Sequence, residues 1–337
     1  MEELAGYGNY IVSSLLTMGG IYAILTLGLN IQWGFTGLFN AGIAGFIAVG
    51  AYVFAILTKG PAAEHLGGYD LPLPLGAIAA MIVAAIIAWA IGKICIRLRS
   101  DYLAIATIGI AEILRLILKN ETWATNGPRG ISGVDKAFEW LPRPWGDIAF
   151  MVTILLTVLV IYLLLERAWR SPWGRLTTAI RDNEDSARAA GKDVETFRLQ
   201  SFVIGAAIMG LAGAYLAQVQ KFIGPDSTDP TTTTFLAWVM LIAGGSGNNR
   251  GAVLGAFLLW TVWSATQIVT GWLPQEIIVF GHPIENVPVR STYLRIFLIG
   301  LVLQIVLQRY SAGILPETRP AVAGKSGKTG LEPGRTT

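Results

Sequence analysis

No charged residue occurs between Leu4 and Thr58, and nearly every residue in that stretch is apolar or small. A helix of about 20 apolar residues crosses the roughly 30 Å hydrocarbon core of a bilayer, so the stretch is long enough for about two crossings. It is much longer than the apolar region of a cleavable signal peptide, which has about 7–15 residues. In water it would expose a large apolar surface. The stretch therefore predicts a membrane protein.

The rest of the chain has the same character, with 53% hydrophobic and only 14% charged residues. A soluble domain has about 25% charged residues. Its other charge-free runs do not alternate in polarity, as the segments of about 10 residues in a transmembrane β-barrel do. We predict an all-α, polytopic membrane bundle of about nine crossings, some of them broken or re-entrant. The expected crossings are 10–30, 39–58, 73–95, 102–120, 147–166, 200–220, 233–246, 251–271 and 291–308.

Lys and Arg concentrate in loops that this threading places on one side, as they do in the cytoplasmic loops of membrane proteins. The loop 167–199 is the richest of them. The N-terminus carries Glu2 and Glu3 without Lys or Arg, so we expect it outside and the C-terminus inside a bacterial-type cytoplasmic (inner) membrane. Residues 1–308 form the expected membrane domain. Residues 309–337, rich in Gly, Pro, Lys and Thr, form an expected disordered cytoplasmic tail. Loops 59–72, 121–146 and 272–290 fall outside.

Residues that could support catalysis or metal binding are scarce. The single cysteine, Cys95, excludes an intrachain disulfide and a cysteine cluster, and His65 and His282 lie far apart in expected loops. Gly324-Lys-Ser and Gly327-Lys-Thr lack the earlier glycine and the preceding strand of a phosphate-binding loop. No basic face with interleaved aromatic residues indicates nucleic acid. We therefore expect no enzyme activity, no cofactor, no metal site and no nucleic-acid partner.

Glycine-rich segments interrupt the helical pattern at 34–50 and 244–256. Glycines let helices approach closely, as in the Gly251–Gly255 GxxxG pair, which we assign to helix packing. They also permit broken helices, which survive at membrane depth only where they are buried or line a cavity. Asn40 and Gly42 are therefore candidates for a solute path. Asn40 could contact a passing solute, or it could hold backbone groups that a helix break frees.

Glu112 and Arg115 lie within an expected crossing and share a helix face at i and i+3. Ionisable residues in a membrane are costly and usually face the bundle interior in pairs. The pair is either a gate or coupling element, or a structural ion pair that joins two helices.

A short helix is expected at 181–191, within the Arg-rich loop. Asp182 could cap it, Asp185 would lie in its first turn, and Gly191 could end it in the left-handed conformation. Ala187, Ala190 and the stem of Arg188 would lie along one side. A small face of this kind suits docking into a cleft of another protein, although an ordinary surface helix has the same pattern.

Several stretches, taken in their order along the chain, resemble the LivM-type permease subunits of branched-chain amino acid ABC importers. They are Gly28–Tyr52, Leu98–Arg115 followed by Thr125–Ile131, Ala179–Gly191 followed by Phe202–Ala214, and Gly244–Ala256. The chain departs from the family pattern at Asp185-Ser186, where small or apolar residues are commoner. It departs also at Ile43, where many relatives have a polar residue.

The resemblance implies that 181–191 is the helix that docks on the ATPase. Its residues would be Arg181, Glu184, Ala187, Arg188, Ala190 and Gly191, with Glu184, Ala187 and Gly191 at key positions. It implies a membrane-spanning subunit that imports Leu, Ile or Val by ATP-driven alternating access. The implied partners are a homologous permease, two cytoplasmic ATP-binding subunits, an extracytoplasmic solute-binding protein and membrane lipid.

Two other functions remain open. The same fold could import another small solute, such as urea, a short amide or a sugar. An autonomous secondary transporter would need ionisable residues in several crossings. In this sequence Glu112 and Arg115 are the clear examples.

The charge asymmetry predicts which loops an impermeant thiol reagent reaches from outside intact cells. Gly130→Cys and Phe280→Cys should be labelled, whereas Asp185→Cys and Lys325→Cys should not. The parent chain, whose single cysteine is Cys95, is the control. Labelling of Asp185→Cys in intact cells would reverse the orientation.

Overall fold

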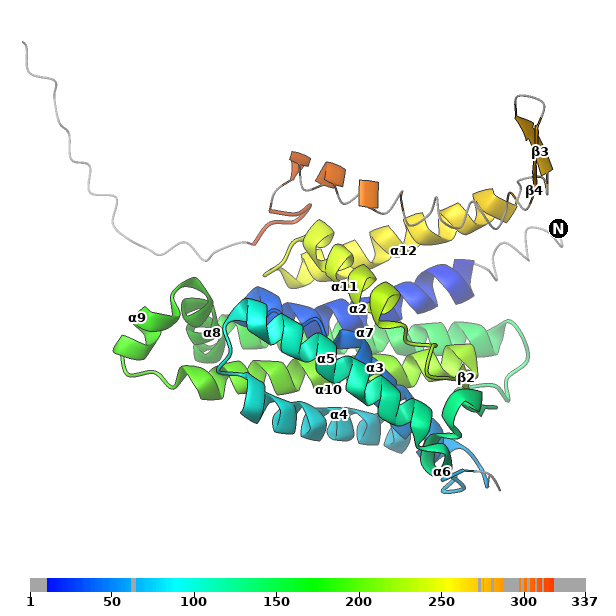
Figure 1. Ribbon diagram of the computed structural model, residues 1–337, viewed down its shortest axis with the longest axis horizontal. Coiled ribbons are helices and arrows are strands. Elements are labelled where there is room, and N and C mark those ends of the chain that lie inside the picture. The colour runs from blue at the N-terminus through cyan, green and yellow to red at the C-terminus, as the bar shows by residue number, and fades with distance from the viewer. Residues whose placement is uncertain are drawn as a thin grey trace, which may run out of the picture.

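The chain forms a bundle of helices that run roughly along the longest dimension of the molecule, as the computed structural model shows (Figure 1). The structure describes residues 11–61 and 65–271, and beyond them 274, 276–279, 282–285, 287, 297, 300–301, 304–306, 308–310 and 312–317. The elements, with η for π and 3₁₀ helices, are η1 (Ile11–Met18), α2 (Gly19–Asn30), η2 (Ile31–Phe35), α3 (Ile43–Thr58), α4 (Leu73–Cys95), α5 (Ser100–Asn120), α6 (Thr122–Thr125), η3 (Gly127–Arg129), β1 (Ile131–Ser132), α7 (Trp145–Arg170), α8 (Pro172–Asp182), α9 (Glu184–Ala189), α10 (Val194–Gln220), β2 (Phe222–Ile223), α11 (Pro230–Gly244), α12 (Asn249–Gly271), β3 (Glu276–Val279) and β4 (His282–Glu285).

Four helical stretches in the described part of the chain are long and apolar enough to cross a membrane: Leu15–Phe35, α4, α7 and α10. At 1.5 Å per residue, the 23 residues of α4 span about 34 Å, which exceeds the hydrocarbon core. These helices confirm an α-helical membrane protein. Strands are a minor addition in two antiparallel pairs, β1 with β2 and β3 with β4.

Two further apolar helices are shorter than the hydrocarbon core is thick. With 16 and 15 residues, α3 and α11 measure about 24 and 22 Å. Non-helical backbone precedes each of them, at 37–42 and 224–229. Gly37 begins the first break with a φ of +68°, which glycine adopts at little cost. The helix break that the sequence permits at 34–50 is therefore present.

The N-terminal parts of these two short helices meet inside the bundle. The backbone N–H of Ala44 donates to the Thr234 hydroxyl at 3.4 Å, and the side chain of Ala44 is buried. The structure thus brings together two helix N-termini that belong to distant parts of the sequence.

Residues 233–271 form the helices α11 and α12, which a turn at 245–248 connects. Gly251 and Gly255 lie against the C-terminal end of α11. A Cβ on Gly255 would overlap the carbonyl oxygen of Met240 and come within 2.8 Å of the Gly244 Cα. The absence of side chains at these positions therefore sets the spacing of the two helices.

The core is organised around α10, which packs most extensively on α4 and α3 and also on α2. At the α3–α10 contact, Gly50 lies directly on the backbone of Gly210. Such small residues let helix backbones approach closely where lipid offers no hydrophobic driving force for association. Phe35, Phe54, Phe150 and Phe202 fill the wider spaces and are fully buried.

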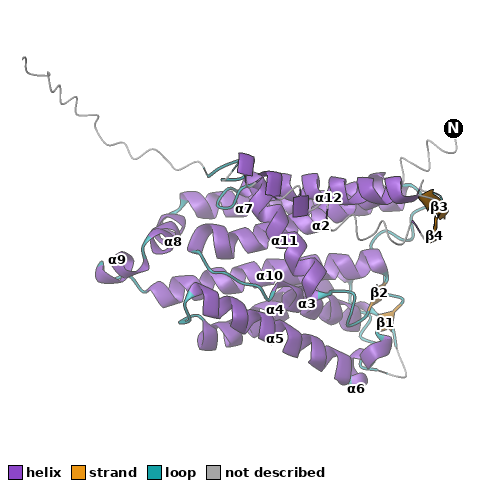
Figure 2. Cartoon of the chain, turned by 45° about the horizontal axis from the view of Figure 1, so that its top comes forward, coloured by secondary structure: helices purple, strands orange, loops and turns teal. Residues whose placement is uncertain are grey.

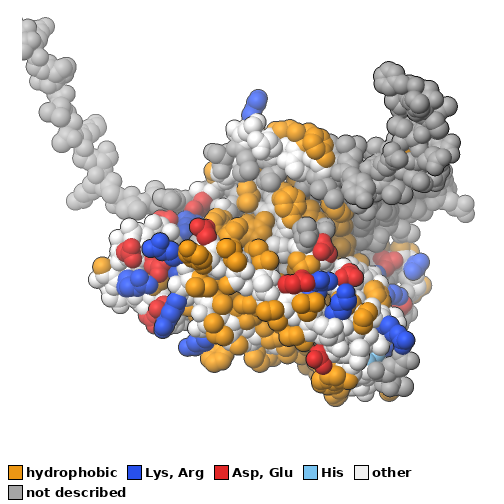
Figure 3. Space-filling model, in the orientation of Figure 1, with side chains coloured by type: hydrophobic (Ala, Val, Ile, Leu, Met, Phe, Trp, Pro, Cys, Tyr) orange, Lys and Arg blue, Asp and Glu red, His pale blue; other side chains and the backbone are white. Residues whose placement is uncertain are grey.

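Helix α4 and helix α7 present apolar stripes to the outside, Ile78, Ile82 and Ile86 on α4 and Leu156, Leu159 and Leu163 on α7. Figure 3 shows apolar side chains across the middle of one face, with charged side chains gathered over α8 and α9 at one end and towards the other end. An exposed apolar belt between charged ends is what a bilayer requires.

The loops sort to the two ends of the bundle as the sequence predicts. α8 and α9 extend beyond one end, and α6, β1, β2 and the β3–β4 hairpin lie at the other (Figures 1 and 2). Loop 59–72 joins the latter group, since the Leu66 amide donates to the Trp123 carbonyl at 2.7 Å. Most of the expected crossing 291–308 lies outside the described residues, so the total of about nine crossings stays a prediction.

The expected disordered tail begins with an ordered segment. Residues 312–317, which we call the C-terminal strap, lie against the end of α11, where the amides of Ile314 and Leu315 donate to the carbonyls of Ala243 and Gly244 at 3.0 and 2.9 Å. These carbonyls belong to the last turn of a helix and have no partner within it. Residues 318–337 lie outside the described residues.

Gly255→Ala should destabilise the α11–α12 contact, because its Cβ meets backbone that cannot rotate away. We expect a loss of about 1–3 kcal/mol, the usual cost of overpacking, measured as heat-induced unfolding in detergent. Gly109→Ala is the matched control, since a Cβ there has nothing within 4 Å. Equal stability of the two variants would show that the glycine contact does not set the helix spacing.

Candidate functional site

The loop 167–199 folds into two short helices, α8 and α9, before α10 begins. Ser171 caps α8 by accepting from the amide of Gly174, and Pro172 occupies its first turn. Asn183, rather than Asp182, caps α9, with its side-chain oxygen accepting from the Ser186 amide at 2.9 Å. The assignment of Asp182 as the cap is wrong because α8 continues through that residue.

Two other local predictions for this loop are confirmed. Asp185 lies in the first turn of α9, and Gly191 has a φ of +74°, so it ends the segment in the left-handed region. Gly191 has no atom within 4 Å of a Cβ position, so only its backbone conformation favours glycine.

The alanines of this helix do not share one face. Ala187 is buried against Ile180 and Val194 of the same chain, with Leu176 and Phe197 alongside. Ala190 and Arg188 are exposed. Any surface that α9 offers to another protein therefore includes Arg188, Ala190 and Gly191, whereas Ala187 anchors α9 to its own chain.

Glu184 connects α9 to the transmembrane helix α10. One carboxylate oxygen accepts from Arg188 at 2.8 Å, and the other accepts from Arg198 on α10 at 3.1 Å. The Arg198 side chain is only 9% exposed and also donates to the Leu98 carbonyl at 3.4 Å. A buried guanidinium needs such a partner, so this ion pair fixes α9 to the bundle.

Arg181 makes a second connection, from the end of α8. Its guanidinium donates to the Gly34 carbonyl in η2 and forms an ion pair with Glu317 of the C-terminal strap at 2.9 Å. The side chains of Arg181 and Glu317 are 17% and 16% exposed. Arg181 therefore joins the end of α8 to the end of the first crossing and to the strap.

An amide network lies next to this connection. Asn30 donates to Asn249 at 3.0 Å and accepts from the Gly247 amide at 2.8 Å, so it joins the first crossing to the α11–α12 turn. Asn248 donates to the Pro316 carbonyl of the strap at 3.1 Å. The connection thus includes α11 and α12.

The polar network around the α3 break holds Asn40 in place. Asn40 donates to Gln32 at 2.9 Å, and its side-chain oxygen accepts from the Gly42 amide at 2.8 Å. Gln32 in turn donates to the Phe202 carbonyl of α10 at 2.8 Å, and the Asn40 carbonyl accepts from the Trp238 indole at 3.1 Å. Asn40 and Gln32 are fully buried.

Two roles were open for Asn40, and the geometry agrees with the second: its side chain holds backbone groups that the helix break frees. Gly42 has a second reason to lack a side chain, since a Cβ there would lie 2.5 Å from the Thr107 carbonyl oxygen. In the described residues, the side-chain amides of Asn40 and Gln32 are therefore hydrogen-bonded within the chain.

Glu112 and Arg115 form the expected i, i+3 pair at 2.6 Å, and Arg115 also binds Asp226 at 3.0 Å. Their side chains are 43% and 23% exposed, and that of Asp226 is 84% exposed. The expectation that the pair faces the bundle interior is wrong for Glu112, which lies at the surface of this chain. The pair joins α5 to the segment that precedes α11.

Two acidic groups outside the crossings have shifted pKa values. A hydrogen bond from Lys221 lowers the pKa of Glu139 below its usual value, across the loops at the β1–β2 end. Hydrogen bonds from the hydroxyl and the amide of Thr196 lower the pKa of Asp193, which caps α10. Because both shifts are downward, these contacts stabilise the fold above the usual acidic pKa and lose that effect as the pH falls.

The described residues contain no group of three or more His, Cys, Asp or Glu placed to hold a metal ion. Sequence reasoning missed the partners of Arg181 and Glu184, namely Glu317 and Arg198. The sequence did indicate that Asn30, Gln32 and Asn249 would be hydrogen-bonded inside the bundle, since a side-chain amide in a charge-free run needs a buried partner. Nothing in the sequence specified which partner each amide would find.

Comparison with known proteins gives a consistent result over nearly the whole chain. The family model described as branched-chain amino acid transport system / permease component matches residues 11–307. The chain is 32% identical to the high-affinity branched-chain amino acid transport system permease protein LivM of Salmonella typhimurium, over 93% of this chain and 72% of that protein. No solved structure matches the chain.

More distant relatives extend this similarity. The probable branched-chain amino acid transport permease protein LivM of Methanocaldococcus jannaschii is 28% identical, over 91% of this chain and 94% of that protein. The permease protein LivH of Salmonella typhimurium is 26% identical, over 72% of this chain and 81% of that protein.

Asn40→Ala should destabilise the break before α3, because it leaves the Gly42 amide and the Gln32 oxygen buried without partners. Each such loss costs about 1–3 kcal/mol, so the heat-induced unfolding midpoint in detergent should fall by several degrees. Asn120→Ala, at an exposed position at the end of α5, is the control and should unfold like the parent chain. An unchanged midpoint for Asn40→Ala would remove the structural role and return Asn40 to the candidates for solute contact.

Proposed function

The chain belongs to the family of branched-chain amino acid transport system permease components, and we propose that it is the membrane-spanning subunit of an ABC importer for Leu, Ile or Val. The observation that carries the proposal is the α8–α9 segment, which extends beyond the bundle and is tied to it by Arg181 and Glu184. ATP hydrolysis would belong to separate subunits.

Helix α9, at the tip of the α8–α9 segment, is the proposed docking site for the ATPase. Arg188, Ala190 and Gly191 form its accessible side, and Ala187 holds it to the chain. An ion pair to a buried guanidinium transmits a displacement of α9 to α10, since separating the two charges is costly.

The proposed mechanism is alternating access. Closure of the ATPases displaces α8 and α9, and the connections through Glu184 and Arg181 carry the movement to α10, the first crossing and the strap. The breaks before α3 and α11 are where the crossings can change tilt, because non-helical backbone absorbs changes in φ and ψ. The ATPase must bind the two conformations of the permease with different affinity. Otherwise ATP binding could not shift the equilibrium between them.

Selectivity for the amino acid lies mainly in an external solute-binding protein. The buried amides that could contact a solute, Asn40 and Gln32, already bond within this chain. The names of the LivM and LivH relatives support branched-chain amino acids as the substrate class.

We propose that the α8–α9 end is cytoplasmic, in line with its arginine content. The N-terminus would then be outside and the C-terminus inside a bacterial-type inner membrane, with about nine crossings. A homologous permease would complete the translocation unit as a heterodimer, since the chain resembles LivM and LivH, two permease proteins of one organism. The exposed apolar stripes on α4 and α7 are available for that partner and for lipid.

Ala190→Trp tests the docking surface, because it places a bulky side chain on the accessible side of α9. We expect normal membrane abundance, at least a fivefold fall in uptake of labelled leucine, and loss of the ATPase subunits that co-purify with the tagged parent chain. The measurement pairs uptake in cells with mass spectrometry of the purified complex.

Ala179→Trp on α8 is the matched control, since Ala179 is also exposed but lies outside α9. It should retain uptake and co-purification. If Ala190→Trp behaves like this control, α9 is an ordinary surface helix. If the tagged parent chain co-purifies with no ATPase and still takes up leucine, the importer assignment fails in favour of an autonomous transporter.

A further inference from the structure

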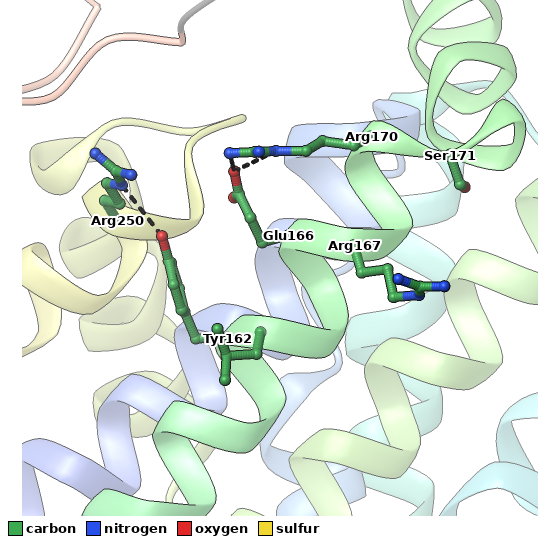
Figure 4. A pocket seen from close by; sticks show the side chains of 7 residues that line it. Tyr162, Glu166, Arg167, Arg170, Ser171 and Arg250 are labelled. Carbon is green, nitrogen blue, oxygen red and sulfur yellow. Dashed lines mark hydrogen bonds and ion pairs between the residues drawn. The ribbon is translucent and has the colours of Figure 1, made fainter.

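A basin of about 740 Å³ opens on the outer face of α7, next to the start of α12. Its lining includes Tyr162, Leu163, Glu166, Arg167, Arg170 and Arg250. Figure 4 shows Arg250 on one side of the basin, Arg170 above it and Arg167 on the other side. Neither of the connections described above, through Arg181 and Glu184, uses any of these residues.

The basin has an excess of positive charge. Glu166 is the acidic residue in its lining, and it is bound to Arg170 at 2.7 Å. Arg250 donates through its Nε to the Tyr162 hydroxyl at 3.1 Å, which holds the side chain at one edge of the basin and uses one of its three guanidinium nitrogens. Arg167 forms no ion pair with any described residue. Two guanidinium groups are therefore available to a bound anion.

The basin lies at the level where the hydrocarbon core ends. Along the exposed side of α7, Leu156, Leu159 and Leu163 are followed by Arg167 and Arg170. An apolar stripe followed by charge marks the change from acyl chains to headgroups. The lower wall of the basin therefore faces acyl chains, and its upper wall faces the headgroup region.

We propose that this basin binds a phospholipid with an anionic headgroup, in the leaflet at the α8–α9 end. The anionic headgroup lies over the end of α7, where Arg167, Arg170 and Arg250 line the basin, and an acyl chain follows the leucine stripe of α7. Basic pockets at membrane depth bind anionic headgroups, because each arginine near the surface adds to the attraction. Guanidinium groups suit a phosphate, since they donate parallel hydrogen bonds.

The position of the basin favours a lipid over a soluble phosphate compound. A soluble ligand would gain nothing from Leu163 or from the stripe below it, whereas an acyl chain buries apolar surface there. A second, smaller cavity shares Glu166, Arg170 and Arg250 and reaches the α11–α12 turn at Gly247 and Asn249. A headgroup in the basin thus lies next to the amide network that joins the first crossing to that turn.

Native mass spectrometry of the full chain, purified in detergent with the subunits it retains, tests the proposal. The probes are phosphatidylglycerol, phosphatidylcholine with the same acyl chains, and glycerol 3-phosphate. We expect the first bound phosphatidylglycerol to bind at least tenfold more tightly than phosphatidylcholine, and glycerol 3-phosphate to leave it in place. The double variant Arg167→Gln/Arg250→Gln should weaken phosphatidylglycerol binding at least fivefold.

Lys93→Gln/Arg97→Gln is the matched control, because it removes two charges from the same end of the bundle, where Arg97 pairs with exposed Glu195. Its binding should change less than twofold. Arg167→Lys/Arg250→Lys changes the same two side chains but keeps their charge, so it should recover most of the affinity. Recovery would show that the Gln double variant loses binding through its charge and not through misfolding.

Four results would each overturn the proposal. Equal binding of the two lipids would show that headgroup charge is not recognised. Displacement by glycerol 3-phosphate would make the ligand a soluble phosphate compound. Equal loss in the two Gln double variants would place the lipid elsewhere, and exclusion of lipid from the complex that retains its ATPases would make the basin a protein interface.

Discussion

The structure depends on one constraint: every backbone N–H and C=O group inside the bundle needs a hydrogen-bond partner within the protein. Hydrocarbon, unlike water, cannot supply one. The long helices α4, α7 and α10 meet this constraint within themselves. The breaks before α3 and α11 do not. Side chains accept from the freed amides there, Asn40 and Thr234 from Gly42 and Ala44 at the start of α3, and Ser227 from Gly224 before α11. The last turn of α11 is closed by the C-terminal strap. Asn40 and Thr234, which are polar side chains at the α3 break, thus take the place of helical hydrogen bonds.

These closures also determine how the parts of the chain can move together. The strap that covers α11 carries Glu317, whose partner Arg181 ends α8. Asn30 binds the α11–α12 turn from the first crossing, and Glu184 joins α9 to α10. In the proposed mechanism, these contacts carry a displacement at α9 to the crossings that border the breaks, where the backbone can respond. The proposed coupling to an ATPase uses contacts that the fold already needs for stability.

The outer surface divides by chemistry into areas that suit different neighbours. The isoleucine stripe of α4 and the leucine stripe of α7 are apolar over several turns and suit lipid chains or a second permease. The basin at the end of α7 combines an apolar wall with guanidinium groups and suits an anionic headgroup. Glu112, with Arg115 and Asp226, lies at the surface between α5 and the segment before α11, where a change in the tilt of α11 would alter the pair.

The sequence by itself determined that this protein lies in a membrane, since a charge-free run from Leu4 to Thr58 is stable only in a bilayer. It also determined most helix positions and the left-handed end at Gly191, because length, apolar runs and backbone preference are local properties. The tertiary structure alone decided the rest. It turned Ala187 inward and Glu112 outward, moved the cap from Asp182 to Asn183, ordered 312–317, and paired Arg181 with Glu317 and Glu184 with Arg198. A buried polar group requires a partner, but which partner it finds depends on residues that only the packed bundle brings together.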